Sequence, residues 1–113
     1  MVNRYLQAMG VVERTSAEVA DGPWVPGLQT QLGYLMAIDS EGVAGAAFEV
    51  APGQIALSFD REQVISARRV ASGLNVIVDA DIRADDGNSV LTVTFIGPRG
   101  RMKRIFAFLG HPL

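Results

Sequence analysis

Two carboxylates in the middle of the chain are the residues best suited to chemistry. Asp39 lies within an otherwise apolar segment, and Glu41 follows two positions later. A carboxylate in apolar surroundings is costly unless it is paired, so such a residue is a candidate for catalysis. As a general base, Asp39 would activate a water molecule for attack on a carbonyl carbon, with Glu41 as the alternate acid. The competing interpretation places both side chains at a solvated turn beside Ser40.

Six of the ten basic residues gather in two places, near the C-terminus and as an adjacent pair. They are Arg99, Arg101, Lys103 and Arg104, with Arg68 and Arg69 elsewhere. The forked guanidinium of arginine suits phosphate groups, so these residues could bind a phosphate-bearing ligand. The alternative is pairing of the arginines with carboxylates on a neighbouring strand. Aromatic residues are not interleaved with the arginines, so no nucleic acid partner is expected.

Several kinds of site are excluded by residue type. The chain has no cysteine, which rules out disulfides, a thiol nucleophile and a zinc-thiolate site. His111 is the only histidine and lies in the C-terminal tail, so neither a Ser-His-Asp triad nor a histidine metal cluster can be built. We therefore expect no metal and no cofactor.

Size and composition predict one globular domain spanning residues 1–113. Of the residues, 49% are hydrophobic and 19% are charged, and the net charge is -2. That charge gives no general attraction to nucleic acid. The first ten residues do not resemble a signal peptide, and no stretch approaches the roughly 18 apolar residues of a membrane span. A cytoplasmic location with no membrane partner is expected.

The N-terminal part of the chain predicts a short helical turn, a strand and a loop. Residues 2–9 carry apolar side chains on one helical face, which Gly10 can end. Residues 11–20 alternate as in a strand, although Thr15 and Glu18 also have the spacing of a helix cap. Residues 21–27 hold two prolines and two glycines and must form a loop.

Residues 32–50 decide the expected architecture. They can be read as two strands around a Ser-Glu-Gly turn, but four alanines favour a helix over strands. Gly42 and Gly45 would lie where a sheet approaches the helix closely. We expect a long helix, centred on residues 34–48, that is buried on nearly all sides.

The second half predicts an antiparallel meander. Residues 74–83 alternate strictly, and Asp86-Gly87 favours a two-residue type I′ turn. Pairing about this turn brings one apolar face together: Ile82 with Leu91, Ala80 with Val93, and Val78 with Phe95. A second turn at residues 97–100 would pair Phe95 with Met102 and Leu91 with Phe106.

Residues 54–69 complete the expected fold. Ile55, Leu57 and Phe59 alternate, and we expect one long strand with a bulge allowed near Arg61. Asp60 and Gln63 could instead cap a short helix. The predicted class is α+β, with one long central helix packed on an antiparallel sheet of about five strands.

These elements resemble the hotdog-fold thioesterases of the phenylacetate-pathway type. In that family the second strand ends F-x-R-P-V-x-x-G, and residues 66–73 (SARRVASG) keep the arginine, the valine and the glycine. Residues 74–100 are similar to the family's three-strand finish. The resemblance covers residues 5–109 and implies a hotdog fold that assembles as a homodimer or tetramer.

The resemblance also implies site residues. The family motif N-x-x-G-x-x-H-G-G, followed by an acid, can be aligned from Asp39 backward. It then falls on Trp24, Gly27, Thr30, Gln31 and Leu32, of which only Gly27 matches, together with Asp39. Asp39 would be the catalytic acid. Gly27, Thr30 and the amides near Gln31, Leu32 and Gly33 would bind the substrate and its oxyanion.

Three functions follow from these expectations. The first is hydrolysis of acyl-CoA thioesters by water attack on the thioester carbonyl, with Arg68 and Arg69 available to the coenzyme A phosphates. The second is a non-catalytic hotdog-like module that binds an acyl-CoA or another small acyl ligand. The third is a small β-rich interaction domain, which follows if residues 32–50 form two strands.

Overall fold

The computed structural model describes residues 10–113, so the helical face expected over residues 2–9 lies outside the described residues. Seven strands form one antiparallel sheet in the order β4-β3-β2-β1-β7-β6-β5. A 3₁₀ turn, η1 (Arg61–Gln63), joins the two edge strands, and one α-helix, α2 (Arg99–Phe108), follows the last strand. The strands are β1 (Val11–Asp21), β2 (Gln31–Ser40), β3 (Val43–Ala51), β4 (Gln54–Asp60), β5 (Val64–Ser72), β6 (Asn75–Arg83) and β7 (Val90–Pro98).

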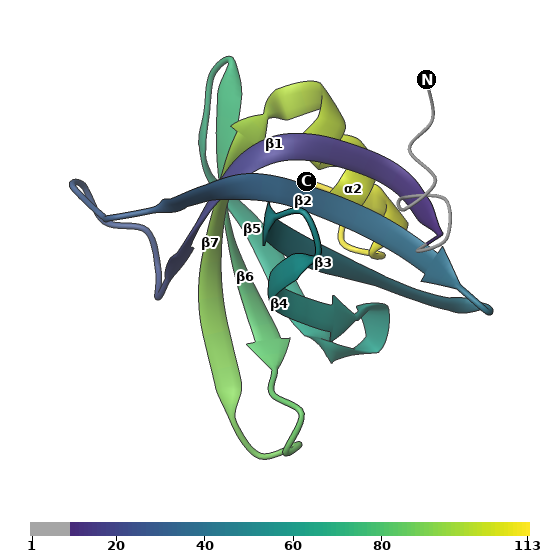
Figure 1. Cartoon of the computed structure of the whole chain (residues 1–113). Helices are drawn as coiled ribbons and strands as arrows, with labels where there is room; N and C mark the ends of the chain where they lie inside the picture. Colours follow the sequence, from purple (N-terminus) through teal and green to yellow (C-terminus); the bar gives the residue numbers. More distant parts are fainter. Residues whose placement is uncertain (1–9) are drawn as a thin grey trace.

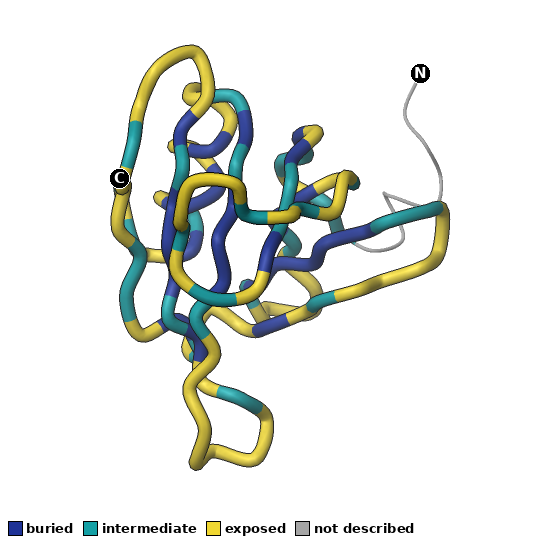
Figure 2. Tube along the Cα trace, turned by 90° about the vertical axis from the view of Figure 1, so that its left-hand side faces the viewer, coloured by how far each residue is buried: buried dark blue, intermediate teal, exposed yellow. Residues whose placement is uncertain are grey.

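The sheet folds over on itself, so that β2 to β4 cross β5 to β7 (Figure 1). Strand β1 belongs to both halves, because it pairs with β2 over most of its length and with β7 only at residues 18–21. The core lies between the halves, where Phe59 of β4 stands 6.3 Å from Phe95 of β7, centroid to centroid. Figure 2 shows the buried residues in this interior and the exposed ones at the hairpin tips.

The helix expected within residues 32–50 is wrong, because this segment is the β2–β3 hairpin. Ser40 pairs with Val43, and the two residues between them have φ values of 53° (Glu41) and 80° (Gly42). Two positive φ values in a two-residue loop are typical of the type I′ turn, which matches the twist of paired strands. The Ser-Glu-Gly turn therefore outweighs the helical preference of the alanines.

The small residues of this hairpin, among them two of the alanines that favoured a helix, serve close strand packing. A Cβ on Gly33 would lie 2.4 Å from the Glu49 carbonyl oxygen, which no side chain tolerates. Ala37 and Ala46 pair with each other and are buried against the core. Alanine and glycine at these positions reflect limited space in the sheet, and propensity yields to that tertiary constraint.

The β6–β7 register is confirmed. Ile82 pairs with Leu91, Ala80 with Val93, and Val78 with Phe95. The turn itself differs, since residues 84–89 form a six-residue loop closed by a hydrogen bond from Ala84 N to Ser89 O. The predicted register is still correct, because the six-residue loop is centred on Asp86 and Gly87, as the predicted two-residue turn was.

The last strand expected, beyond residue 100, is wrong because residues 99–108 form α2. Met102, Ile105 and Phe106 are fully buried, at the spacing of one helical face. A strand would have put Arg104 on the same face as Met102 and Phe106. The two apolar residues still reach the predicted core, where Phe106 lies 5.9 Å from Phe95.

The strand expected over residues 54–69 is broken at Arg61–Gln63 by η1, where Asp60 and Gln63 form a capping box. The alternative helix is confirmed only at this cap, because residues 64–72 form β5. The fold is therefore mostly β, and the α+β hotdog architecture with a long central helix is contradicted. Within residues 10–113, no helix is both long enough and apolar enough to cross a membrane.

Candidate anion-binding site

The residues expected to catalyse and to bind the oxyanion lie at opposite ends of one strand. Asp39 is exposed near the C-terminal end of β2, and Glu41 is exposed in the turn that follows. Gln31, Leu32 and Gly33 begin the same strand. At about 3.3 Å per residue, Gln31 and Asp39 are roughly 25 Å apart. The amides of Gln31 to Gly33 belong to a strand, so the helix N-terminus that was to bind the oxyanion does not form.

The other expected binding residues are also dispersed. Gly27 lies in the β1–β2 loop with φ of 82°. The Thr30 hydroxyl donates to the Glu18 carboxylate at 2.6 Å. Arg68 forms an ion pair with Asp81 at 3.3 Å, and Arg69 is exposed on β5. The structure does not bring these residues to one site.

A different group of residues surrounds a hollow of about 440 Å³ between β1 and the start of α2. Two arginines, Arg14 of β1 and Arg101 of α2, contribute the only charges among the described residues that line it. Hydroxyl groups and one aromatic ring complete the lining. We call this site the arginine hollow; it comprises Arg14, Thr15, Ser16, Tyr34, Pro98 and Arg101.

The Arg14 guanidinium is stacked on an aromatic ring, but one of its hydrogen-bond donors has no partner within residues 10–113. Its guanidinium carbon lies 3.7 Å from the centre of the Tyr34 ring, a cation–π stack that fixes the plane of the side chain. Its Nε atom is buried and has no hydrogen-bond partner within residues 10–113. A buried donor without an acceptor costs about 1–3 kcal/mol, and more when it is charged.

Arg101 is positioned by the backbone of β1. Its Nη1 donates to the Arg14 carbonyl oxygen at 2.9 Å, at the edge of β1 where β7 has diverged. The neighbouring Arg104 is neutralised by Glu13, with 2.7 Å between Nε and Oε1. Among residues 10–113, neither Arg14 nor Arg101 forms an ion pair.

The hollow continues into a groove of about 490 Å³ with a mixed lining. Ser16, Tyr34 and Pro98 line both spaces. Along the groove, Leu32, Val50 and Ile96 supply apolar surface, and Leu32 is 73% exposed. The combined shape has a cationic end and a largely apolar extension that Glu18 and Asn75 also line, and an amphipathic anion could occupy it with its charge beside the arginines.

A second polar group, the aspartate cluster, lies on the outer face of β5 to β7. It comprises Ser66, Arg68, Asp79, Asp81, Thr92 and Thr94. The hydrogen bond from Thr92 holds the pKa of Asp81 below its ordinary value, with Ser66 and Arg68 acting in the same direction against partial burial. Asp79 is 4% exposed and accepts from Thr94 Oγ1 at 2.6 Å and from the Trp24 backbone N–H at 3.1 Å.

The histidine and the acidic residues offer no metal site within the described chain. His111 Nε2 lies 3.0 Å from the Val64 carbonyl oxygen, which ties the C-terminal tail to β5. No group of three or more histidine, cysteine or acidic residues in residues 10–113 is placed to hold a metal ion.

Sequence reasoning considered Arg101 for phosphate binding but missed Arg14, Ser16 and Tyr34. Arg14 and Ser16 alternate on the outer face of a strand that was expected. Their neighbour Tyr34 could not be placed, because it pairs with Ser16 only when residues 31–40 form a strand. The mistaken helix therefore hid the site.

Comparisons with protein-family models, with curated proteins and with solved structures give no match for this chain. The arginine hollow is consequently interpreted from its own geometry.

Proposed function

We propose that this protein is a non-catalytic β-rich binding module that holds the anionic group of an amphipathic ligand in the arginine hollow. The supporting observation is the pair of arginines that line the hollow: Arg14 is stacked on Tyr34, Arg101 is held by the Arg14 carbonyl oxygen, and neither forms an ion pair within residues 10–113. A carboxylate or a phosphate would accept hydrogen bonds from Arg14 and Arg101, and such charge-assisted bonds are the strong ones. The apolar part of the ligand would extend along Leu32 and Ile96.

This proposal keeps the ligand class expected from the sequence and changes the site. A small acyl compound, including an acyl-CoA with its phosphates, has the required anionic and apolar parts. Hydrolysis of a thioester gains no support from the geometry, because Asp39 lies about 25 Å along β2 from the expected oxyanion amides. Assembly as a homodimer or tetramer and a cytoplasmic location remain predictions.

The test is an NMR titration with three six-carbon probes: hexyl phosphate, hexanoate and hexanol. We expect saturable shifts at Ser16, Tyr34 and Arg101 with both anions and much weaker shifts with the neutral alcohol. Arg14→Gln should weaken hexyl phosphate binding about tenfold, the equivalent of one strong charged hydrogen bond. The matched control, Arg68→Gln, changes an arginine that is already paired and should leave the affinity unchanged.

Two results would contradict the proposal. One is the absence of shifts in the arginine hollow with either anion. The other is equal binding of hexanol and hexyl phosphate, since the arginines would then contribute nothing.

A further inference from the structure

Among residues 10–113, the most exposed large hydrophobic residue lies at the tip of a hairpin. Leu74 is 96% exposed, in the turn between β5 and β6. The turn is well formed, because Gly73 N donates to Asn75 O at 2.8 Å. Val70, at the β5 bulge below the tip, is also 43% exposed. Leu74 therefore contributes nothing to the core, and its apolar surface is exposed at the tip.

The tip is next to positive charge. The Leu74 carbonyl oxygen accepts from Arg99 N at 3.1 Å, which fixes the start of α2 beside the turn. Asn75 pairs with Pro98, and Pro98 lines the arginine hollow. Leu74, Arg99 and the hollow with its two arginines therefore occupy one end of the molecule, which we call the basic end (Leu74, Arg99, Arg14 and Arg101).

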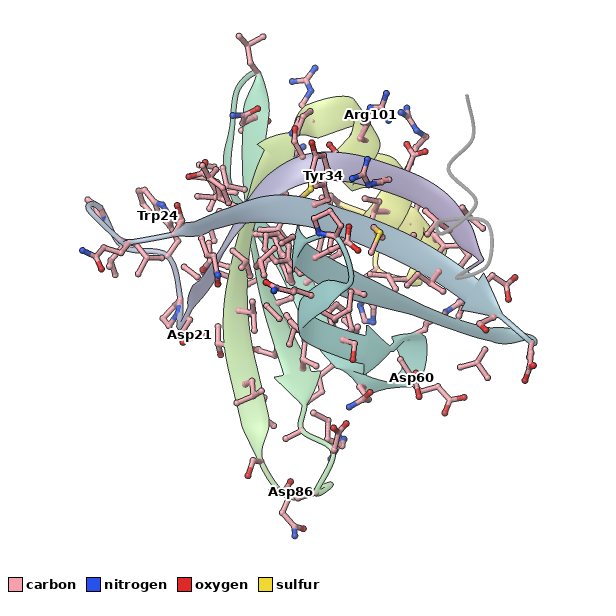
Figure 3. The ribbon with its side chains drawn as sticks, in the orientation of Figure 1. Asp21, Trp24, Tyr34, Asp60, Asp86 and Arg101 are labelled. Atoms are coloured by element: carbon pink, nitrogen blue, oxygen red, sulfur yellow. The ribbon has the colours of Figure 1, made fainter. Side chains whose placement is uncertain are left out.

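The opposite end carries acidic loops. In Figure 3, Arg101 lies on the same side as the β5–β6 tip, whereas Asp86 lies at the far end, in the β6–β7 loop. Asp85 of that loop accepts a hydrogen bond from Gln63, which brings η1 close by. At this end Asp85, Asp86 and Glu62 outnumber two arginines, Arg61 of η1 and Arg83 at the end of β6. Such a separation of charge orients the basic end toward a negatively charged surface.

We propose that the basic end docks on an anionic lipid bilayer, with a lipid headgroup phosphate in the arginine hollow and Leu74 inserted into the interface. This inference rests on the proposed function and names the source of its anion. Arginines near an anionic leaflet are attracted to it, and one leucine adds the burial of its apolar surface. The expectation of no membrane partner concerned spanning segments, which surface binding does not need.

Vesicle sedimentation tests the inference with the full chain. Vesicles of phosphatidylcholine containing about 30% phosphatidylglycerol should bind the protein, whereas pure phosphatidylcholine vesicles should not, and about 0.5 M salt should weaken binding strongly. Leu74→Gln should reduce binding about tenfold, which corresponds to the loss of one inserted apolar side chain. The matched control is Val90→Gln, an exposed hydrophobic residue at the acidic end (53% exposed), which should bind as the wild type does.

The outcomes separate this inference from the proposed function. Hexyl phosphate binding without binding to anionic vesicles overturns the bilayer inference and leaves the function standing. Loss of both overturns both. Equal losses of vesicle binding for Leu74→Gln and Val90→Gln also overturn the inference. A competition experiment overturns it too if single-stranded RNA displaces the protein from the vesicles and binds the wild type and Leu74→Gln equally.

Discussion

The arginine hollow and the aspartate cluster are two polar surfaces of the same sheet, and they differ in how many of their polar atoms have hydrogen-bond partners. In the aspartate cluster, the Asp81 carboxylate accepts from Thr92, Ser66 and Arg68. In the hollow, Arg14 Nε has no acceptor within residues 10–113. A polar group that is fully paired inside the fold stabilises the fold. One that is held rigid and left unpaired can bind something else.

The largest effect should come from breaking the aspartate cluster at Asp79. Asp79→Ala removes a buried acceptor from the Trp24 N–H and the Thr94 hydroxyl, and should lower the free energy of unfolding by about 2–3 kcal/mol. Urea denaturation measures this change. The control, Asp39→Ala, removes an exposed carboxylate and should cost less than about 0.5 kcal/mol.

Two results would contradict this distinction between the two surfaces. One is an equal loss of stability in both variants, and the other is that Asp79→Ala abolishes hexyl phosphate binding while the protein stays folded. In either case the aspartate cluster would not be a purely structural group.

A smaller effect should appear in the pH dependence of stability. The pKa of Asp81 in the folded state is depressed, mainly by the Thr92 hydrogen bond, so the ionised form stabilises the fold. That contribution is fully present above the unfolded pKa of about 4 and is lost as the pH falls through the folded value. Asp86 acts in the same direction, because the Asn88 and Ser89 amides lower its pKa.

Thr92→Val isolates the Asp81 contribution. Denaturation midpoints at about pH 6, 4 and 3 should fall less steeply for this variant than for the wild type, while the Asp86 contribution is common to both. An unchanged slope would show that Thr92 does not set the pKa of Asp81.

The sequence predicted the parts of the fold whose signals are local. The alternation in residues 76–82 is set by burial on one face, and it gave the β6–β7 register although the turn type was wrong. Strand β1 followed from the same alternation. The mistaken helix has a physical explanation. The alanines of residues 32–50 favour a helix in isolation, and only the neighbouring strands show that the space between them requires small side chains.

The candidate site could not be predicted, because it depends on contacts distant in sequence. Arg14 and Arg101 are 87 positions apart and meet only because α2 packs on the edge of β1. Reading residues 99–108 as a strand placed Arg101 opposite the aspartates, where it would be neutralised. The sequence does contain one signal for the helix, because the spacing of Met102, Ile105 and Phe106 matches one helical face. A helix there turns Arg101 toward the hollow.

The most direct test follows the arginine Nε–H signals by ¹H–¹⁵N NMR during a hexyl phosphate titration. Arg14 and Arg68 are compared within one spectrum, since Arg14 Nε has no partner within residues 10–113, whereas Arg68 is paired with Asp81 through Nη1. The account predicts a large, saturable shift of the Arg14 Nε–H signal and no change at Arg68. Equal shifts at both arginines, or a motionless Arg14 signal at saturating ligand, would contradict the claim that the arginine hollow binds anions.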